Sequence, residues 1–181
     1  MIEQYTYETD TDRLLLVMNT MPATFTMTGS RVYAPAVVRN DSDFDYIVNP
    51  KVMWHNSDVF TGLISACSYP YKGVVMPTIE RSGPEYGDAS IDENQHLVYI
   101  VGQRNSLRPK INMIFLREDI RYFQWLSATY IMKMMRGKDE KRLENKEARL
   151  LCFHAIVAAV TVPPQKEMEQ RCNNLREKIN K

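Results

Sequence analysis

Polar and apolar residues follow two different periods along this chain, and the period changes near residue 117. Before that point, 24–28 alternates polar and apolar residues, and apolar-rich runs lie at 44–48, 96–101 and 110–116. Alternation and short apolar runs of this kind predict β-strands. After residue 117, apolar residues recur at spacings of three and four, which predicts amphipathic helices.

Turn and capping residues indicate where the helices begin and end. A helix over 11–19 stops before Pro22, and a short helix is expected to start near Ser30. Three further helices are expected after residue 117, over 119–137, over 139–160 and after Pro164. The first of them is predicted to bury one apolar face, which consists of Ile120, Phe123, Leu126, Ile131 and Met134. The segment 69–94 contains prolines and glycines and is predicted to be mostly loop.

These elements predict an α/β protein. Residues 1–117 are expected to form the α/β core, a small mixed sheet flanked by helices, and 118–181 a helical C-terminal subdomain. A chain of 181 residues can bury a hydrophobic core without the help of disulfides or a structural metal.

Composition removes several classes of protein. With 23 basic and 22 acidic residues, the formal charge of +1 argues against dedicated DNA binding, which depends on neutralising many phosphates. The three cysteines are scattered and predict neither a disulfide framework nor a zinc site. Because no apolar run approaches the ~18 residues that span a bilayer, we expect no membrane partner and a cytoplasmic location.

The segment 28–48 carries the candidate chemistry. Gly29 ends a predicted strand, and because it lacks a Cβ it would let a phosphate approach the backbone. Ser30 adds a hydroxyl group where the next helix begins. Asp43 and Asp45 lie two residues apart on the following strand, so both point to the same face. Two adjacent carboxylates repel each other, which favours a hard cation such as Mg²⁺ between them.

A Gly-Ser pair followed by an Asp-x-Asp pair, each at a predicted strand boundary, resembles the nucleotidyltransferase superfamily with its polymerase-beta-like fold. The similarity covers 28–48 and includes Arg31 directly after the Gly-Ser pair. More loosely, the strand 111–114 followed by Phe123 and Trp125 is similar to nucleotidyltransferase-like proteins encoded by bacteriophages.

This resemblance implies a minimal nucleotidyltransferase fold and a role for each residue of the motif. Asp43 and Asp45 would bind Mg²⁺ and act in catalysis. The phosphates of a nucleoside triphosphate (NTP) would be held by Gly29, Ser30 and Arg31.

One position departs from the family pattern. Active members place a third carboxylate on a later strand, where the strand 110–116 has Asn112 instead. Asparagine cannot act as a general base, although its carbonyl oxygen can ligate a metal. Asn112 is therefore the third candidate catalytic residue, beside Asp43 and Asp45. The resemblance implies two Mg²⁺ ions, and with Asn112 we expect one to bind and the other to bind weakly or not at all. Three acidic residues could supply the missing carboxylate from elsewhere: Glu80, Asp92 and Glu118.

Plainer structural explanations stay open for the motif residues. Gly29 and Ser30 also fit a simple strand-to-helix turn with a serine N-cap. Asp41 fits a solvated turn. Asn112 fits a buried amide that is satisfied by backbone groups.

The remaining polar residues point less clearly to function. Arg104, Arg108 and Lys110 fit either contacts with a triphosphate or solvated loop positions. His154 lies on an apolar helix face and is expected in the core. The run 136–149 mixes both signs of charge, which is typical of a solvated helix face.

Two functions follow from the sequence. The first is a Mg²⁺-dependent enzyme that transfers a nucleotidyl group from an NTP to a hydroxyl group on a protein, an RNA or a small molecule. The second is a catalytically impaired relative, encoded by a phage and acting in the host cytoplasm as a binding module on a host protein or RNA. The missing third carboxylate at Asn112 is the reason to keep both.

Overall fold

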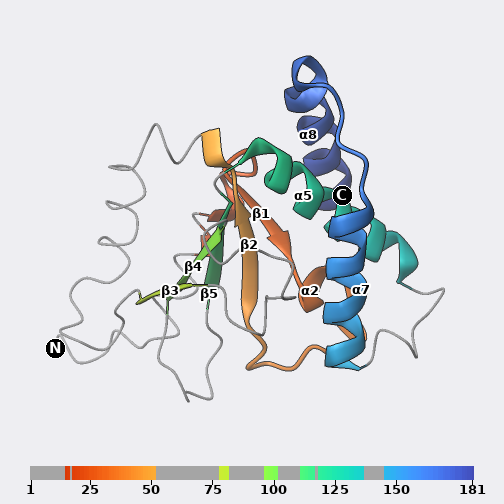
Figure 1. Cartoon of the computed structure of the whole chain (residues 1–181). Coiled ribbons are helices and arrows are strands. Elements are labelled where there is room, and N and C mark those ends of the chain that lie inside the picture. Colours follow the sequence, from red (N-terminus) through yellow and green to blue (C-terminus); the bar gives the residue numbers. More distant parts are fainter. Residues whose placement is uncertain are drawn as a thin grey trace, which may run out of the picture.

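The computed structural model describes residues 15–16, 18–51, 78–81, 96–101, 111–116, 118–136 and 145–181. Within these ranges the protein is a mixed α/β structure, with one sheet and a layer of helices (Figure 1). Residues 15, 16, 18 and 19 are helical, inside the helix predicted for 11–19. Arg104, Arg108, Lys110 and Asp92 lie outside the described residues.

The sheet has five strands in the order β1-β2-β5-β4-β3. Strands β2 and β5 run parallel, and the other neighbouring pairs run antiparallel, so the sheet is mixed as predicted. Four strands match the predicted positions closely. The bounds are Phe25–Thr28 for β1, Phe44–Val48 for β2, Thr78–Arg81 for β3, His96–Val101 for β4 and Ile111–Leu116 for β5.

Strand β3 lies inside the segment 69–94 that was expected to be mostly loop, and the rest of that segment lies outside the described residues. Its residues pair antiparallel with β4, Thr78 opposite Ile100 and Arg81 opposite Leu97. The sequence of β3 is short and polar and does not by itself predict a strand. Its backbone hydrogen bonds come from the pairing with β4.

Among the described residues, four helices follow the predicted order after the first strand. Their bounds are Ser30–Tyr33 for α2, Asp119–Met135 for α5, Lys146–Ala159 for α7 and Gln165–Asn180 for α8, and a 3₁₀ turn, η1, spans Pro35–Val37. Helix α7 begins at an N-cap, Asn145, whose side chain accepts a hydrogen bond from the Ala148 amide at 3.0 Å. This bond satisfies one of the unpaired amides of the first turn.

The buried face of α5 differs from the predicted one. Phe123 and Leu126 are buried as expected, but Ile120, Ile131 and Met134 are exposed. The buried residues also include Tyr122, Trp125 and Met132. Apolar residues surround most of this helix, so their spacing does not identify the face that packs on the sheet.

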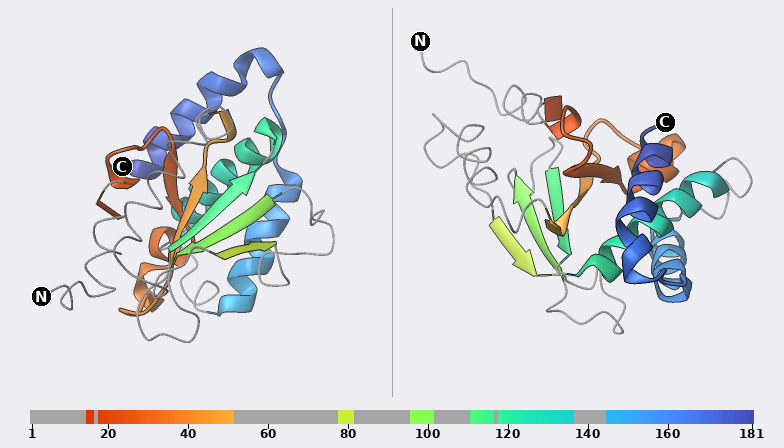
Figure 2. Two further views of the ribbon diagram at one scale, coloured as in Figure 1. Left: turned by 90° about the vertical axis from the view of Figure 1, so that its left-hand side faces the viewer. Right: turned by 90° about the horizontal axis from the view of Figure 1, so that it is seen from above.

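Helices α5, α7 and α8 lie on one side of the sheet (Figure 2). On this side Ile47 of β2 and Ile114 and Leu116 of β5 pack in one hydrophobic core with residues of all three helices, among them Trp125, Phe153 and Met168. The core therefore joins residues from both sides of the boundary predicted at residue 117, and the division into two subdomains stays a prediction. In the described residues, none of the helices is long and apolar enough to cross a membrane.

Helix α5 anchors both ends of the segment that contains Gly29. At one end the hydroxyls of Thr28 and Thr129 are hydrogen bonded at 2.7 Å, and the Thr129 hydroxyl donates to the Trp125 carbonyl at 2.8 Å. At the other end Arg136 donates through Nη1 to the Val32 carbonyl at 3.0 Å. The turn from β1 into α2 is therefore held against a buried helix.

Candidate functional site

Asp43, Asp45 and Asn112 come together at neighbouring strands. In the parallel pairing of β2 with β5, Asp45 lies opposite Asn112. The Asn112 side chain donates through Nδ2 to Asp45 Oδ1 at 2.8 Å and to Asp43 Oδ2 at 3.4 Å. The Asn112 side chain thus contacts both carboxylates, although the catalytic and metal-binding roles of the three residues stay predictions.

Gly29 lies directly against this cluster, because Thr28 pairs with Asp45 across β1 and β2. The backbone of Gly29 has φ 77° and ψ −165°, a conformation that is essentially restricted to glycine. A Cβ at this position would lie 2.3 Å from Asp45 Oδ2. The structure therefore gives Gly29 a local reason that the sequence did not suggest, which is to leave room for the Asp45 carboxylate.

Ser30 is the first residue of α2, and the N-cap is Gly29. The strand-to-helix turn of the alternative explanation is therefore present, but its N-cap is Gly29 and not the serine. A serine N-cap must precede the first helical residue so that its hydroxyl can reach back to the free amides. The predicted contact of Ser30 with a phosphate stays a prediction.

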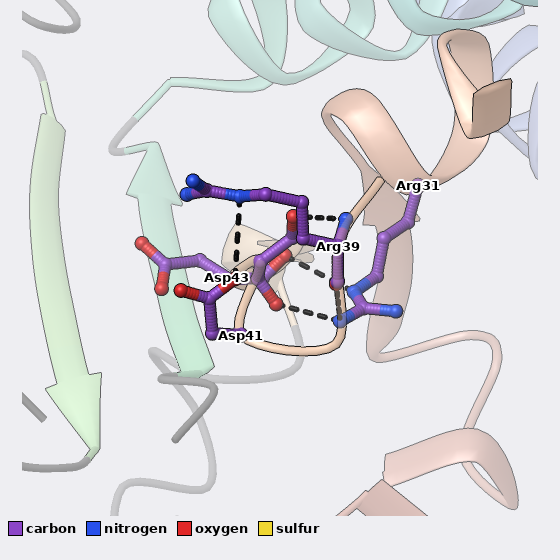
Figure 3. Close-up of polar contacts among 5 residues, drawn as sticks. Arg31, Arg39, Asp41 and Asp43 are labelled. Atoms are coloured by element: carbon purple, nitrogen blue, oxygen red, sulfur yellow. Dashed lines mark hydrogen bonds and ion pairs between the residues drawn. The ribbon is translucent and has the colours of Figure 1, made fainter. Parts of the chain in front are cut away.

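Arg31 turns toward the backbone of the loop that leads into β2 (Figure 3). It donates through Nη2 to the Ser42 carbonyl at 2.6 Å and through Nε to the Asp43 carbonyl at 3.3 Å. Its guanidinium carbon lies 3.7 Å from the centre of the Phe44 ring. Partial burial lowers the pKa of Arg31, and the nearby Asp45 and Asp43 oppose that change. These contacts make Arg31 a residue that positions Asp43, and its predicted role toward phosphates stays a prediction.

The loop before β2 is further closed by its own turn. The Ser42 amide donates to the Arg39 carbonyl at 3.0 Å, and the Arg39 amide donates to Ser42 Oγ at 2.8 Å. Asp41 lies in this turn, as expected, and forms an ion pair of 3.2 Å with Arg39 (Figure 3). Because the Arg39 side chain is 78% exposed, this ion pair contributes little to stability.

The environment of Asp45 disfavours its charge. Burial raises its pKa to about 6, and the neighbouring Asp43 carboxylate also raises it. The hydrogen bond from Asn112 and the charges of Lys146 and Arg31 act in the opposite direction without cancelling the shift. A strongly shifted carboxyl group beside a second carboxylate is more typical of a binding or catalytic site than of structural packing.

The side chains present fit a hard divalent cation. Among the residues that the structure describes, no group of three or more His, Cys, Asp and Glu side chains lies together. The ligands that Asp43, Asp45 and Asn112 can offer are carboxylate and amide oxygens, which suit Mg²⁺ better than a soft metal. Two carboxylates and one amide bind such a cation more weakly than three carboxylates do.

Glu118 does not supply the missing carboxylate. It follows the end of β5, whereas Asn112 lies near the start of the same strand. The four residue steps from Asn112 to Leu116 extend over about 13 Å at the usual rise of a strand. Glu118 is therefore too far along the chain to join Asp45.

Two basic residues near the site were not identified from the sequence. The charge of Lys146 lowers the pKa of Asp45. The charge of Arg149 lowers the pKa of Tyr33, whereas the charge of Asp45 raises the pKa of Tyr33. Both belong to α7, which contacts α2 where the rings of Tyr33 and Phe153 stack with centroids 6.1 Å apart. The mixed charges of 136–149 did not indicate that Lys146 and Arg149 lie near the site, because only the packing of α7 on α2 brings them there.

His154 is buried, as expected from its apolar helix face. Its ring lies edge-on to Trp125 and to Phe153, with centroids 5.9 Å and 5.5 Å apart. These contacts place it within the aromatic part of the core.

Comparison with protein-family models, with curated proteins and with solved structures finds no match to this chain.

Replacing Arg31 with lysine is expected to lower the free energy of unfolding by about 1–2 kcal/mol, because lysine keeps the charge but loses the planar group that bonds two carbonyls and stacks on Phe44. Urea denaturation of the purified protein measures this. Arg39→Lys is the matched control and should change stability by less than about 0.5 kcal/mol. Equal effects of the two substitutions would contradict the positioning role.

Proposed function

We propose that this protein is nucleotidyltransferase-like and binds an NTP together with Mg²⁺ at Asp43 and Asp45. The observation that carries the proposal is the convergence of Asp43, Asp45 and Asn112, from two strands, beside a glycine whose conformation leaves room for a carboxylate. The motif residues follow the family's order in the sequence and also lie close together in space. A chance occurrence of Gly-Ser and Asp-x-Asp would not require this proximity.

Different residues have different roles in such a site. Asp43 and Asp45 hold the cation, which when bound neutralises charge on the phosphates. Arg31 holds the loop that presents Asp43. Lys146 and Arg149 add positive potential on the side of α7, which attracts an anionic nucleotide. In the enzymatic form of the proposal, the nucleotidyl group passes to a hydroxyl group of a protein, an RNA or a small molecule.

A second function is favoured by Asn112. Its amide nitrogen, and not a carboxylate, faces Asp43 and Asp45. A neutral amide cannot take the proton of an acceptor hydroxyl. The alternative is therefore a catalytically impaired module that retains nucleotide binding and acts by binding a host protein or RNA.

Transfer is tested by incubating the purified protein and Mg²⁺ with NTPs labelled on the α-phosphate, together with a cell lysate or a tRNA pool. The enzymatic function predicts label on the protein itself or on an acceptor, and Asp43→Ala should abolish the label. Asp41→Ala is the matched control, because it removes an acidic residue of the same loop that lies in the outer turn. Label that persists in Asp43→Ala would exclude this site.

Calorimetric titration with an NTP separates the two functions. Binding without any transfer supports the module, and binding with transfer supports the enzyme. If neither the wild-type protein nor Asn112→Asp binds an NTP, both functions are wrong.

A further inference from the structure

The Asn112 amide nitrogen occupies the contact position between the two carboxylates. It lies 2.8 Å from Asp45 Oδ1 and 3.4 Å from Asp43 Oδ2. Carboxylate oxygens only accept hydrogen bonds, so the NH₂ group, and not the carbonyl oxygen, must face them when no cation is present. The amide thus supplies the partial positive charge that the two acids need.

A divalent cation at the same carboxylates competes with this arrangement. It requires oxygen ligands, and the Asn112 nitrogen cannot ligate it because the nitrogen lone pair is delocalised into the carbonyl group of the amide. For Asn112 to contribute its carbonyl oxygen, the amide has to turn over and give up the hydrogen bonds to both acids. The side chain is 4% exposed, so this rearrangement takes place inside packed structure.

We propose that the Asn112 amide takes the place of a cation at the two carboxylates. Without metal the amide compensates their charge, and a divalent ion binds only by displacing the amide. The identity of the cation rests on the proposed function, but the competition does not. Asn112 is therefore a positioning residue that weakens metal binding, which is the opposite of the ligand role that the sequence left open.

The two roles predict opposite effects of Asn112→Ala. If Asn112 were a ligand, its removal would weaken metal binding. If it is a competitor, removal leaves two uncompensated carboxylates, and Mn²⁺ should bind more tightly than to the wild-type protein, by about threefold to tenfold. Asn112→Asp, which adds a charged ligand, should bind Mn²⁺ at least about tenfold more tightly than the wild type.

The experiment is calorimetric titration of Mn²⁺ into the whole chain, paired with thermal unfolding in a chelator and in Mn²⁺. The wild type should show nearly the same melting temperature in both conditions, whereas both Asn112 variants should melt lower in the chelator and recover with Mn²⁺. The matched control is Asn49→Ala, which removes another buried amide, one that donates to the Ala23 carbonyl at 3.0 Å. It should leave the response to Mn²⁺ unchanged.

Weaker or unchanged Mn²⁺ binding in Asn112→Ala, or no Mn²⁺ binding by any of the proteins, overturns the inference. If Asn112→Asp does not fold in the chelator but folds when purified with Mn²⁺, the inference is supported. Failure of the proposed function is visible separately, as Mn²⁺ binding that follows the expected order while no variant binds an NTP.

Discussion

Replacing Gly29 with alanine is expected to lower the free energy of unfolding by about 3–5 kcal/mol and to disrupt the acidic cluster. The backbone at φ 77° and ψ −165° costs roughly 1–3 kcal/mol for any residue with a Cβ. The new methyl group would also lie 2.3 Å from Asp45 Oδ2 and 3.1 Å from Asp45 Cγ. The carboxylate must move, and the hydrogen bond from Asn112, a bond to a charged group worth about 1.5–3 kcal/mol, is lost with it.

Urea denaturation at neutral pH measures this loss. Ser30→Ala is the matched control, since it changes the adjacent residue without placing a new atom against Asp45, and we expect an effect below about 1 kcal/mol. A double-mutant cycle with Asp45→Ala separates strain from collision, because the backbone strain remains when the carboxylate is removed. If Gly29→Ala is equally destabilising with and without the Asp45 carboxylate, the collision is not part of the cost.

Replacing Asp45 with asparagine is expected to stabilise the metal-free protein by up to about 3 kcal/mol above pH 7. Burial raises the pKa of Asp45 to about 6 from its ordinary value of 3.8. Because this pKa is higher in the folded than in the unfolded state, the unfolded chain loses the proton first. The wild type therefore loses this stability as the pH rises from about 4 to about 6, and asparagine does not.

The measurement is urea denaturation of both proteins in a chelator across this pH range. The difference should vanish near pH 4, grow up to about pH 6 and stay constant above it. Mg²⁺ should reduce the difference, since a cation stabilises only the charged side chain. Asp41→Asn, in the exposed turn, should differ from the wild type by less than about 0.5 kcal/mol throughout. A variant that is less stable than the wild type at pH 8 would show that the Asp45 charge is already compensated in the protein.

These two expectations describe a site that costs stability. Gly29 tolerates a carboxylate at close range, and Asp45 retains a charge that its surroundings disfavour. Structural packing alone would favour a neutral residue at position 45. A destabilising charge held in a defined place is understandable if a cation or a ligand compensates it.

The local pattern of the sequence determined most of the described secondary structure and the motif. Period-two alternation and short apolar runs located β1, β2, β4 and β5, and the longer period located α5, α7 and α8. The spacing of Asp43 and Asp45 placed two carboxylates on one face, and Gly29 marked a strand end. Such features are encoded by neighbours in the chain, so they can be recognised before the fold is known.

Tertiary structure decided everything that depends on distant residues. The register of β2 against β5 places the Asn112 nitrogen on both acids, the pairing with β4 makes a strand of 78–81, and packing selects the buried face of α5. The loop before β2 engages Arg31, and α7 brings Lys146 toward Asp45. These contacts join segments that are separated along the chain, and their energies depend on geometry that no local pattern carries.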